Sequence, residues 1–324
     1  MMNNSNLTSL SSLEAREECY ETCNGTAIPT DNSSGHNLNG YSLQDLIFFL
    51  AICLICSFGL LGNGNVLWLL GFRMKRNPFT TFILNLAVAD FGVLLCLFIL
   101  SIFSILGTFT NVFFDLLIWQ FLVLSFYSIH NISQVLLAAI SIERCVSVLF
   151  PIWHRCHRPT HLSTTVCALI WVISSSLFAI PSTLSLTNQF STPVKIGYLY
   201  IATCFLCLPL MAISSLILFI KVCFKSQKNQ RRRLIRTILL TLLFFLVFAF
   251  PLSATHFINI FVIESMHYRH LFHYSYIGAS LNSSVNPLIY FLVGRKKKSQ
   301  SRETMKAILQ RVFKEEEEIL ESTV

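Results

Sequence analysis

The chain has 324 residues, of which 54% are hydrophobic and only 12% are charged, about half the charged fraction of a typical soluble domain. Its net charge of +8 comes from clusters between long apolar runs, which excludes a soluble nucleic-acid-binding domain with a basic face. The composition indicates a chain whose main solvent is lipid, where only helices or a closed barrel satisfy the backbone.

Residues 1–42 are polar and predict a glycosylated amino-terminal tail outside the cell. Sequons of the form Asn-x-Ser/Thr, the acceptor pattern for N-glycosylation, occur in this segment at Asn3, Asn6, Asn24 and Asn32. We expect at least one of these asparagines to carry a sugar chain.

Seven apolar runs follow, and each is about as long as a helix must be to cross the hydrocarbon core. They are rich in Leu, Ile and Phe without alternating polarity, which favours helices over barrel strands. The runs cover residues 43–71, 79–106, 112–149, 162–186, 196–224, 234–263 and 271–293. The predicted fold of residues 43–293 is an all-α membrane protein, a seven-transmembrane helix bundle.

Basic residues fix the expected orientation of this bundle. All 24 lysines and arginines except Arg16, Lys195 and Arg269 lie in or beside the segments that follow the odd-numbered runs. Positive charge of this kind marks the cytoplasmic side of a membrane protein. We therefore expect a multi-pass plasma-membrane protein with its amino terminus outside and its carboxyl terminus in the cytoplasm.

The carboxyl-terminal segment, residues 294–324, predicts a short amphipathic eighth helix and an acidic tail. Lysines and arginines between residues 296 and 306 would face lipid headgroups, while Ile308 and Leu309 would face the acyl chains. The final Ser322-Thr323-Val324 fits strand addition to a PDZ domain, although so short a pattern is also frequent by chance.

Asp90 is the only acid in the middle of a run, and an ionisable side chain at that depth marks a functional site by default. We expect a pocket of polar side chains around it, formed by Asn63, Ser133, Asn282, Ser283 and Asn286. Oxygen ligands suit a hard cation such as sodium, which would act as an allosteric ion. The alternative is a structural polar cluster satisfied by water and neighbouring side chains, and the sequence leaves both interpretations open.

Glu143 and Arg144 end the third run at the predicted inner face. We expect them to pair with each other at rest, and the released guanidinium to reach the backbone of a docked partner helix. The alternative is an arginine that only anchors the helix end. Asn286, Pro287 and Tyr290, near the end of the seventh run, would complete this switch.

Prolines lie inside each of the last three runs, at Pro209, Pro251 and Pro287. Each removes a backbone hydrogen bond and permits a kink, although membrane helices also tolerate proline without any special role. We expect Pro251, with Phe245 one and a half turns earlier, to form the hinge of the sixth helix.

A ligand pocket is expected toward the outer side, lined by Phe126, His130 and His256. The histidines have no metal-binding spacing with carboxylate support, so no metal beyond sodium and no other cofactor is predicted. The alternative for these histidines is a buried or interfacial position whose polar atoms are satisfied by neighbours.

Three stretches resemble the Mas-related G-protein-coupled receptors of the rhodopsin-like family: residues 71–79, residues 139–159 with the Glu143-Arg144 pair, and residues 282–294 with Asn286-Pro287. The resemblance points to the H subtype. It implies a receptor without enzymatic activity that binds a peptide or small amine, activates heterotrimeric G proteins and engages arrestin. Members are often found in nociceptive sensory neurons and several are orphans.

The resemblance also implies that the usual outer disulfide is missing, and the sequence agrees. The start of the third run and residues 187–195 contain no cysteine. Ala249 stands where most rhodopsin-like receptors have tryptophan, which puts the rotamer switch usually placed there in doubt.

The main alternative is a seven-helix transporter or channel. A transporter predicts internal repeats and paired interrupted helices, and no repeat is visible. A retinal protein needs a lysine in the seventh run, and residues 271–293 contain none. An intramembrane enzyme needs paired catalytic groups, whereas Asp90 has no such partner in the sequence.

Overall fold

The computed structural model describes residues 43–74, 77–110, 115–159, 161–186, 192–224 and 269–294, together with residues 252, 254, 255 and 258. Within these ranges every regular element is a helix and there is no strand. The sequons at Asn3, Asn6, Asn24 and Asn32, most of the sixth run with Phe245, Pro251 and His256, and the predicted eighth helix lie outside the described residues.

Six of the seven predicted spans correspond to helices. They are α2 (Leu43–Trp68), continued by one π-helical turn η2 (Leu69–Arg73), α3 (Pro78–Thr110), α4 (Leu116–Leu149), α6 (Leu162–Leu186), α7 (Thr192–Phe224) and α9 (Arg269–Gly294). In the described part of the chain, four segments are long and apolar enough to cross a membrane: Leu43–Arg73, Pro78–Thr110, Leu117–Ser147 and Leu162–Ile180. The predicted boundaries hold to within a few residues.

Helix starts are set by local polar side chains. Asn77 and Thr80 cap α3 reciprocally, since the Thr80 amide donates to Asn77 Oδ1 at 2.7 Å and the Asn77 amide donates to Thr80 Oγ1 at 2.8 Å, satisfying two amides that the helix leaves unpaired. Asp115 caps α4 by accepting from the Leu117 amide at 2.9 Å. Short polar side chains are preferred at such positions for this reason.

One element departs from the predicted organisation. The predicted spans do not include the basic segment after the third run, where residues Pro151–Cys156 form a short helix, α5. Proline disfavours the helical conformation in the residue before it, so α4 ends at Leu149 and Phe150 adopts φ −125°. Proline itself is favoured in the first turn of a new helix, which explains why α5 begins at Pro151.

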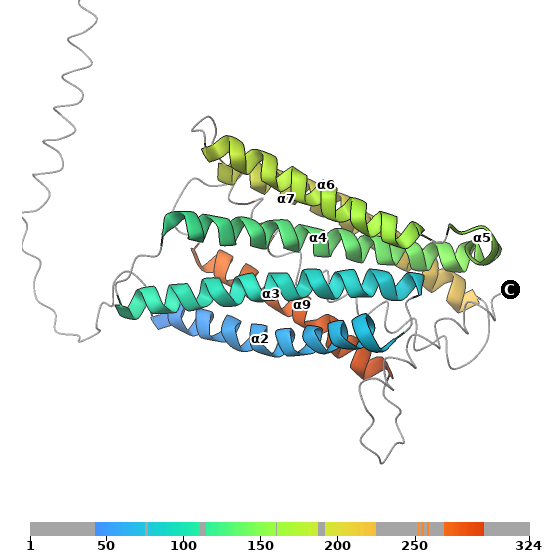
Figure 1. Ribbon diagram of the computed structural model, residues 1–324, viewed down its shortest axis with the longest axis horizontal. Helices are drawn as coiled ribbons and strands as arrows, with labels where there is room; N and C mark the ends of the chain where they lie inside the picture. The colour runs from blue at the N-terminus through green and yellow to red at the C-terminus, as the bar shows by residue number, and fades with distance from the viewer. Residues whose placement is uncertain are drawn as a thin grey trace, which may run out of the picture. The chain divides into compact units, whose positions relative to one another are not determined.

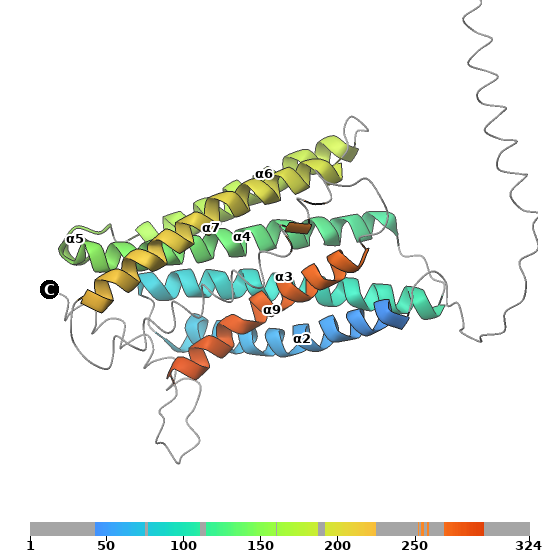
Figure 2. The same cartoon turned by 180° about the vertical axis from the view of Figure 1, so that it is seen from behind.

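The helices pack in a layered order around α3 and α4. α3 contacts α2, α4, α6 and α9, while α4 also contacts α6 and α7. Figures 1 and 2 show this order from opposite sides: α2 and α9 lie on one side of α3 and α4, and α6 and α7 lie on the other. The main apolar clusters lie between α3 and α4, around Leu94 and Phe126 and around Leu86 and Leu136.

Many large apolar side chains point away from this interior. Phe58 is 75% exposed and Phe205 is 71% exposed, which is the expected arrangement where lipid replaces water around a helix bundle.

Pro209 lies inside α7 and Pro287 lies inside α9, as predicted. Glycines of α2 allow α9 to approach closely at this level: a Cβ built on Gly62 would lie 3.2 Å from Pro287 Cβ. The helix that carries the Asn-Pro-x-x-Tyr sequence is therefore seated directly on α2.

Candidate functional site

Asp90 joins three helices in the middle of the bundle. Its side chain, on α3, is fully buried. Oδ1 accepts a hydrogen bond from Ser133 Oγ of α4 at 2.7 Å, and Oδ2 accepts one from Asn286 Nδ2 of α9, also at 2.7 Å. Because one carboxyl group accepts hydrogen bonds from side chains of two other helices, this contact ties α9 to α3 and α4.

The other predicted pocket residues lie around this contact with different partners. Asn63 donates to the Ser283 carbonyl at 3.0 Å and to the Gly59 carbonyl at 3.1 Å, so it joins α2 to α9 through the backbone. Ser283 is wholly buried and lies near the Asp90 carboxyl group, but its Oγ makes no hydrogen bond within the described part of the chain. Asn282 is also buried, and among the described residues its Nδ2 has no hydrogen-bond partner.

These residues fit a sodium ion by their chemistry. A carboxylate and the hydroxyls of Ser133 and Ser283 are hard oxygen donors of the kind that such a cation takes. They also fit the structural interpretation, because each Asp90 oxygen already accepts a hydrogen bond from a side chain.

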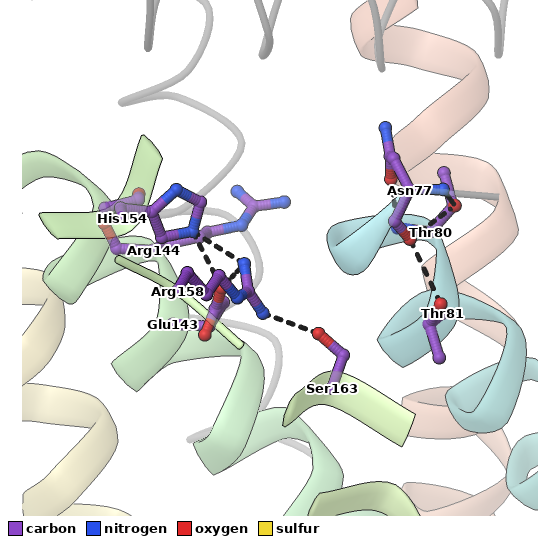
Figure 3. Close-up of polar contacts among 9 residues, drawn as sticks. Asn77, Thr80, Thr81, Glu143, Arg144, His154, Arg158 and Ser163 are labelled. Atoms are coloured by element: carbon purple, nitrogen blue, oxygen red, sulfur yellow. Dashed lines mark hydrogen bonds and ion pairs between the residues drawn. The ribbon is translucent and has the colours of Figure 1, made fainter. Parts of the chain in front are cut away.

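A second polar cluster lies at the carboxyl-terminal end of α4, where this helix meets α5 and α6. Glu143 Oε1 lies 2.5 Å from Arg158 Nη1 and 2.9 Å from His154 Nε2. Arg158 Nη2 donates to Ser163 Oγ, on the first turn of α6, at 2.5 Å. Figure 3 shows the His154 and Arg158 side chains converging on the Glu143 carboxylate, with Ser163 next to Arg158. We call Glu143, His154, Arg158 and Ser163 the loop latch, because they tie α4, α5 and α6 together.

The prediction that Glu143 pairs with Arg144 was wrong, because the Glu143 carboxylate contacts His154 and Arg158. The Arg144 guanidinium instead lies over the Phe79 ring of α3, 4.6 Å from its centroid, and Figure 3 shows it extending past the latch. Successive residues on a helix do not face each other, so Glu143 and Arg144 project in different directions. Glu143 therefore meets the loop, while Arg144 meets α3.

Tyr290 lies on α9 one turn beyond Asn286 and is almost buried. It packs in a cluster with Val66 and Leu70 of the first span and with Ile83 and Ala87 of α3. The Asn-Pro-x-x-Tyr sequence thus runs from the Asp90 contact at Asn286 to an apolar cluster nearer the Arg144 end of the bundle.

Phe126 and His130 lie side by side in the interior, and both side chains are fully buried. Their rings stack with centroids 5.7 Å apart, and His130 Nε2 lies 3.3 Å from Gln134 Nε2. Tyr276 of α9 meets Phe126 edge-on at 5.5 Å, and its hydroxyl lies 3.3 Å from that of Tyr127. These residues form an aromatic cluster between α4 and α9; the third predicted pocket residue, His256, is outside the described part of the chain.

Sequence reasoning missed three members of the loop latch and the two tyrosines. His154 lies on α5 and Arg158 lies two residues beyond the end of this helix, so their approach to Glu143 depends on the path of the segment after α4, which no predicted span covers. Tyr127 and Tyr276 meet only because α4 and α9 present particular faces to each other, which no local pattern encodes.

Comparison with known proteins identifies relatives over most of the chain. The family model described as "7 transmembrane receptor (rhodopsin family)" matches residues 62–290. The human protein named Proto-oncogene Mas is 35% identical over 301 residues, covering 89% of this chain and 90% of the relative. Human Mas-related G-protein coupled receptor member X1 is 39% identical over 291 residues, covering 85% and 86%.

Mouse Mas-related G-protein coupled receptor member H is 36% identical over 310 residues, covering 92% of this chain and 91% of the relative. The predicted H subtype is thus one of several relatives at comparable identity. These similarities single out a group of proteins without choosing a subtype.

Proposed function

Because the chain belongs to the Mas-related group of the rhodopsin-like seven-transmembrane receptors, we propose that it binds a peptide or small amine outside the cell and activates heterotrimeric G proteins inside. Membership of a receptor family does not favour the transporter alternative. The proposal concerns the class of ligand and the activation of G proteins.

The observation that carries this proposal is the contact of Asp90 with both Ser133 and Asn286. One buried carboxyl group holds α9, which contains a proline next to the contacting asparagine, against α4, the helix that carries Arg144 near its carboxyl-terminal end. Any change that weakens one of these two hydrogen bonds alters the position of the inner part of α9. A ligand produces such a change when it binds one arrangement more tightly than the other.

We infer the following activation step from the geometry. Agonist binding moves the outer parts of the helices, Asn286 leaves Asp90, and α9 rearranges at Pro287 so that Tyr290 leaves its apolar cluster. Arg144 then moves away from Phe79, and its guanidinium binds the backbone of the inserted G-protein helix. The sixth helix, hinged at Pro251 with Phe245, opens the inner face.

The loop latch acts separately from Arg144 in this scheme. Glu143 neutralises Arg158 and fixes α5, whose exposed Ile152 and Trp153 stand beside the partner's docking place. Releasing the latch frees α5 to adapt to the partner, so the latch restrains coupling in the resting receptor.

A sodium ion in the Asp90 pocket is the proposed allosteric regulator. Asp90, Ser133 and Ser283 would hold it, with Asn282 and Asn286 nearby. The ion would supply positive charge that stabilises a carboxylate in lipid and so favours the resting arrangement.

The remaining proposals concern topology and partners. The basic residues support an outer amino terminus, glycosylated at Asn3, Asn6, Asn24 or Asn32, and a cytoplasmic carboxyl terminus at the plasma membrane. The resemblance to the family supports arrestin as a second partner and a place in nociceptive sensory neurons. Ser322-Thr323-Val324 supports a PDZ domain as a third partner.

A cell-based screen of peptides and small amines tests the proposal, with calcium and cyclic AMP measured together. The expected result is a response to at least one ligand in cells that express the chain, and its loss in cells that express Arg144→Ala at the same surface level. Equal responses in the two cell lines, or transport of a ligand without a second-messenger response, would contradict the proposal.

A further inference from the structure

Asp45 and His273 form a buried polar contact near the amino-terminal ends of α2 and α9. Asp45 is the third residue of α2 and His273 is the fifth residue of α9. Their side chains come together with Asp45 Oδ1 3.5 Å from His273 Nδ1. Only 2% of Asp45 and 6% of His273 are exposed, although each lies within about one turn of its helix start.

Two aromatic rings of α2 pack against the imidazole. The Phe48 ring stacks on His273 with centroids 5.4 Å apart and planes at 13°, and the Phe49 ring meets it edge-on at 5.3 Å. Phe48 also contacts Tyr274 of α9 at 5.0 Å. Because an aromatic face attracts a cation, a carboxylate and a stacked ring together make surroundings that suit a charged imidazolium.

We propose that Asp45 and His273 form a binding site for a proton from the extracellular solution, which clasps the outer end of α2 to that of α9. Histidine is the side chain whose charge ordinarily changes between pH 5 and 8. Protonation converts a contact between a carboxylate and a neutral ring into an ion pair. A carboxylate attracts a charged ring more strongly than a neutral one, and the attraction is larger in a buried site than in water, so this conversion strengthens the attachment of α9 to α2.

The ionisable groups near His273 can be named for the helices that the structure describes. On α2, the facing group is Asp45. α3 also packs against α9, and its outer residues 97–110 contain no ionisable side chain. On α9 itself the ionisable neighbours in sequence are Arg269, His270, Tyr274 and Tyr276. Asp45 is thus the acid that these helices place against the imidazole.

The clasp bears on signalling because α9 also carries Asn286 and Tyr290. Acid outside the cell would hold the outer end of α9 on α2 and so oppose any rearrangement that moves it. This regulatory consequence rests on the proposed function, whereas the proton site itself does not.

The proton site is tested on the full-length purified receptor in detergent by measuring its melting temperature between pH 5.5 and pH 8. His273→Phe keeps an aromatic ring against Phe48 but cannot bind a proton, and Asp45→Asn keeps the shape of the acid. His157→Gln, which changes an exposed histidine near the loop latch, is the matched control.

Between pH 8 and pH 5.5, the melting temperatures of the unmodified receptor and of the control should rise by about 3 °C more than those of the two clasp variants. The double variant should add nothing to the single ones, because both remove the same contact. Equal pH dependence in the unmodified receptor and the two clasp variants would overturn the proton site. If His273→Phe does not fold, the pH dependence of the melting temperature of Asp45→Asn tests the proton site by itself.

The regulatory consequence is tested in cells by measuring agonist potency at external pH 7.8 and 6.3. We expect acid to lower potency about 5-fold or more, as for a typical allosteric coupling, and Asp45→Asn to remove that shift. Identical potency at both pH values in the unmodified receptor would overturn regulation, whatever the melting experiment shows.

Discussion

Replacing Gly59 with alanine tests how closely α9 is seated on α2. A Cβ at this position would lie 2.2 Å from Ser284 Oγ and 2.7 Å from Leu94 Cδ1, well inside van der Waals contact. Ser284 Oγ donates to the Ser280 carbonyl at 2.7 Å, with a longer 3.4 Å contact to the Ile55 carbonyl. The new methyl group must therefore displace α9, Leu94 or the serine.

The two opposing effects of this substitution have known sizes. Overpacking an interior contact costs about 1–3 kcal/mol, while replacing glycine by alanine within a helix returns about 0.5–1 kcal/mol. The net loss expected for Gly59→Ala is about 1 kcal/mol. For a chain of this size a loss of that order lowers the melting temperature by about 2–4 °C.

The assay is thermal unfolding of the purified receptor, with Gly71→Ala as the matched control. A Cβ at Gly71 would meet no atom within 4 Å, so that substitution should leave the melting temperature unchanged or raise it slightly. If Gly59→Ala is as stable as the unmodified receptor, or if both alanine variants lose the same stability, then the close packing of α2 on α9 is refuted.

Further substitutions test the polar sites. Sodium should reduce agonist affinity, and Asp90→Asn should remove that effect in radioligand binding; affinity that ignores sodium in the unmodified receptor would leave only the structural interpretation. Arg158→Gln should raise basal second-messenger levels about as much as Glu143→Gln, because both release the loop latch, and basal levels unaffected by Arg158→Gln would show that the latch does not restrain coupling. Signalling should survive a mild extracellular reductant, and a loss of surface receptor under that treatment would reveal an outer disulfide. Glycosidase should increase gel mobility, unless all four predicted acceptors are changed to glutamine: Asn3, Asn6, Asn24 and Asn32.

The Asp90 contact could be predicted from sequence because lipid restricts the alternatives. A carboxylate in the middle of an apolar run must find polar partners inside the bundle, and the apolar runs contain few. Ser133 and Asn286 were therefore expected near Asp90 before their 2.7 Å contacts were seen. Asn63 was expected there too, but it bonds the Ser283 backbone, a partner type that side-chain patterns do not reveal.

The loop latch could not be predicted in the same way. It depends on the conformation of residues 150–158, where a proline ends one helix and begins the next. Pro151, at the first position of α5, is a local signal for this short helix, which carries His154, whereas Arg158 lies beyond its end. Glu143 and Arg144 do not pair, although they are adjacent in sequence, because successive residues on a helix project in different directions.

Arg144, which lies over Phe79 and not against Glu143, is the group that we propose to meet the G protein. This role can be tested by guanine-nucleotide exchange on purified heterotrimeric G protein, driven by receptor reconstituted in lipid. We expect Arg144→Ala to fold with an unchanged melting temperature and unchanged agonist binding in the absence of G protein, yet to give almost no exchange. Exchange by Arg144→Ala equal to that of the unmodified receptor would contradict the claim and leave Arg144 as an anchor of the α4 end.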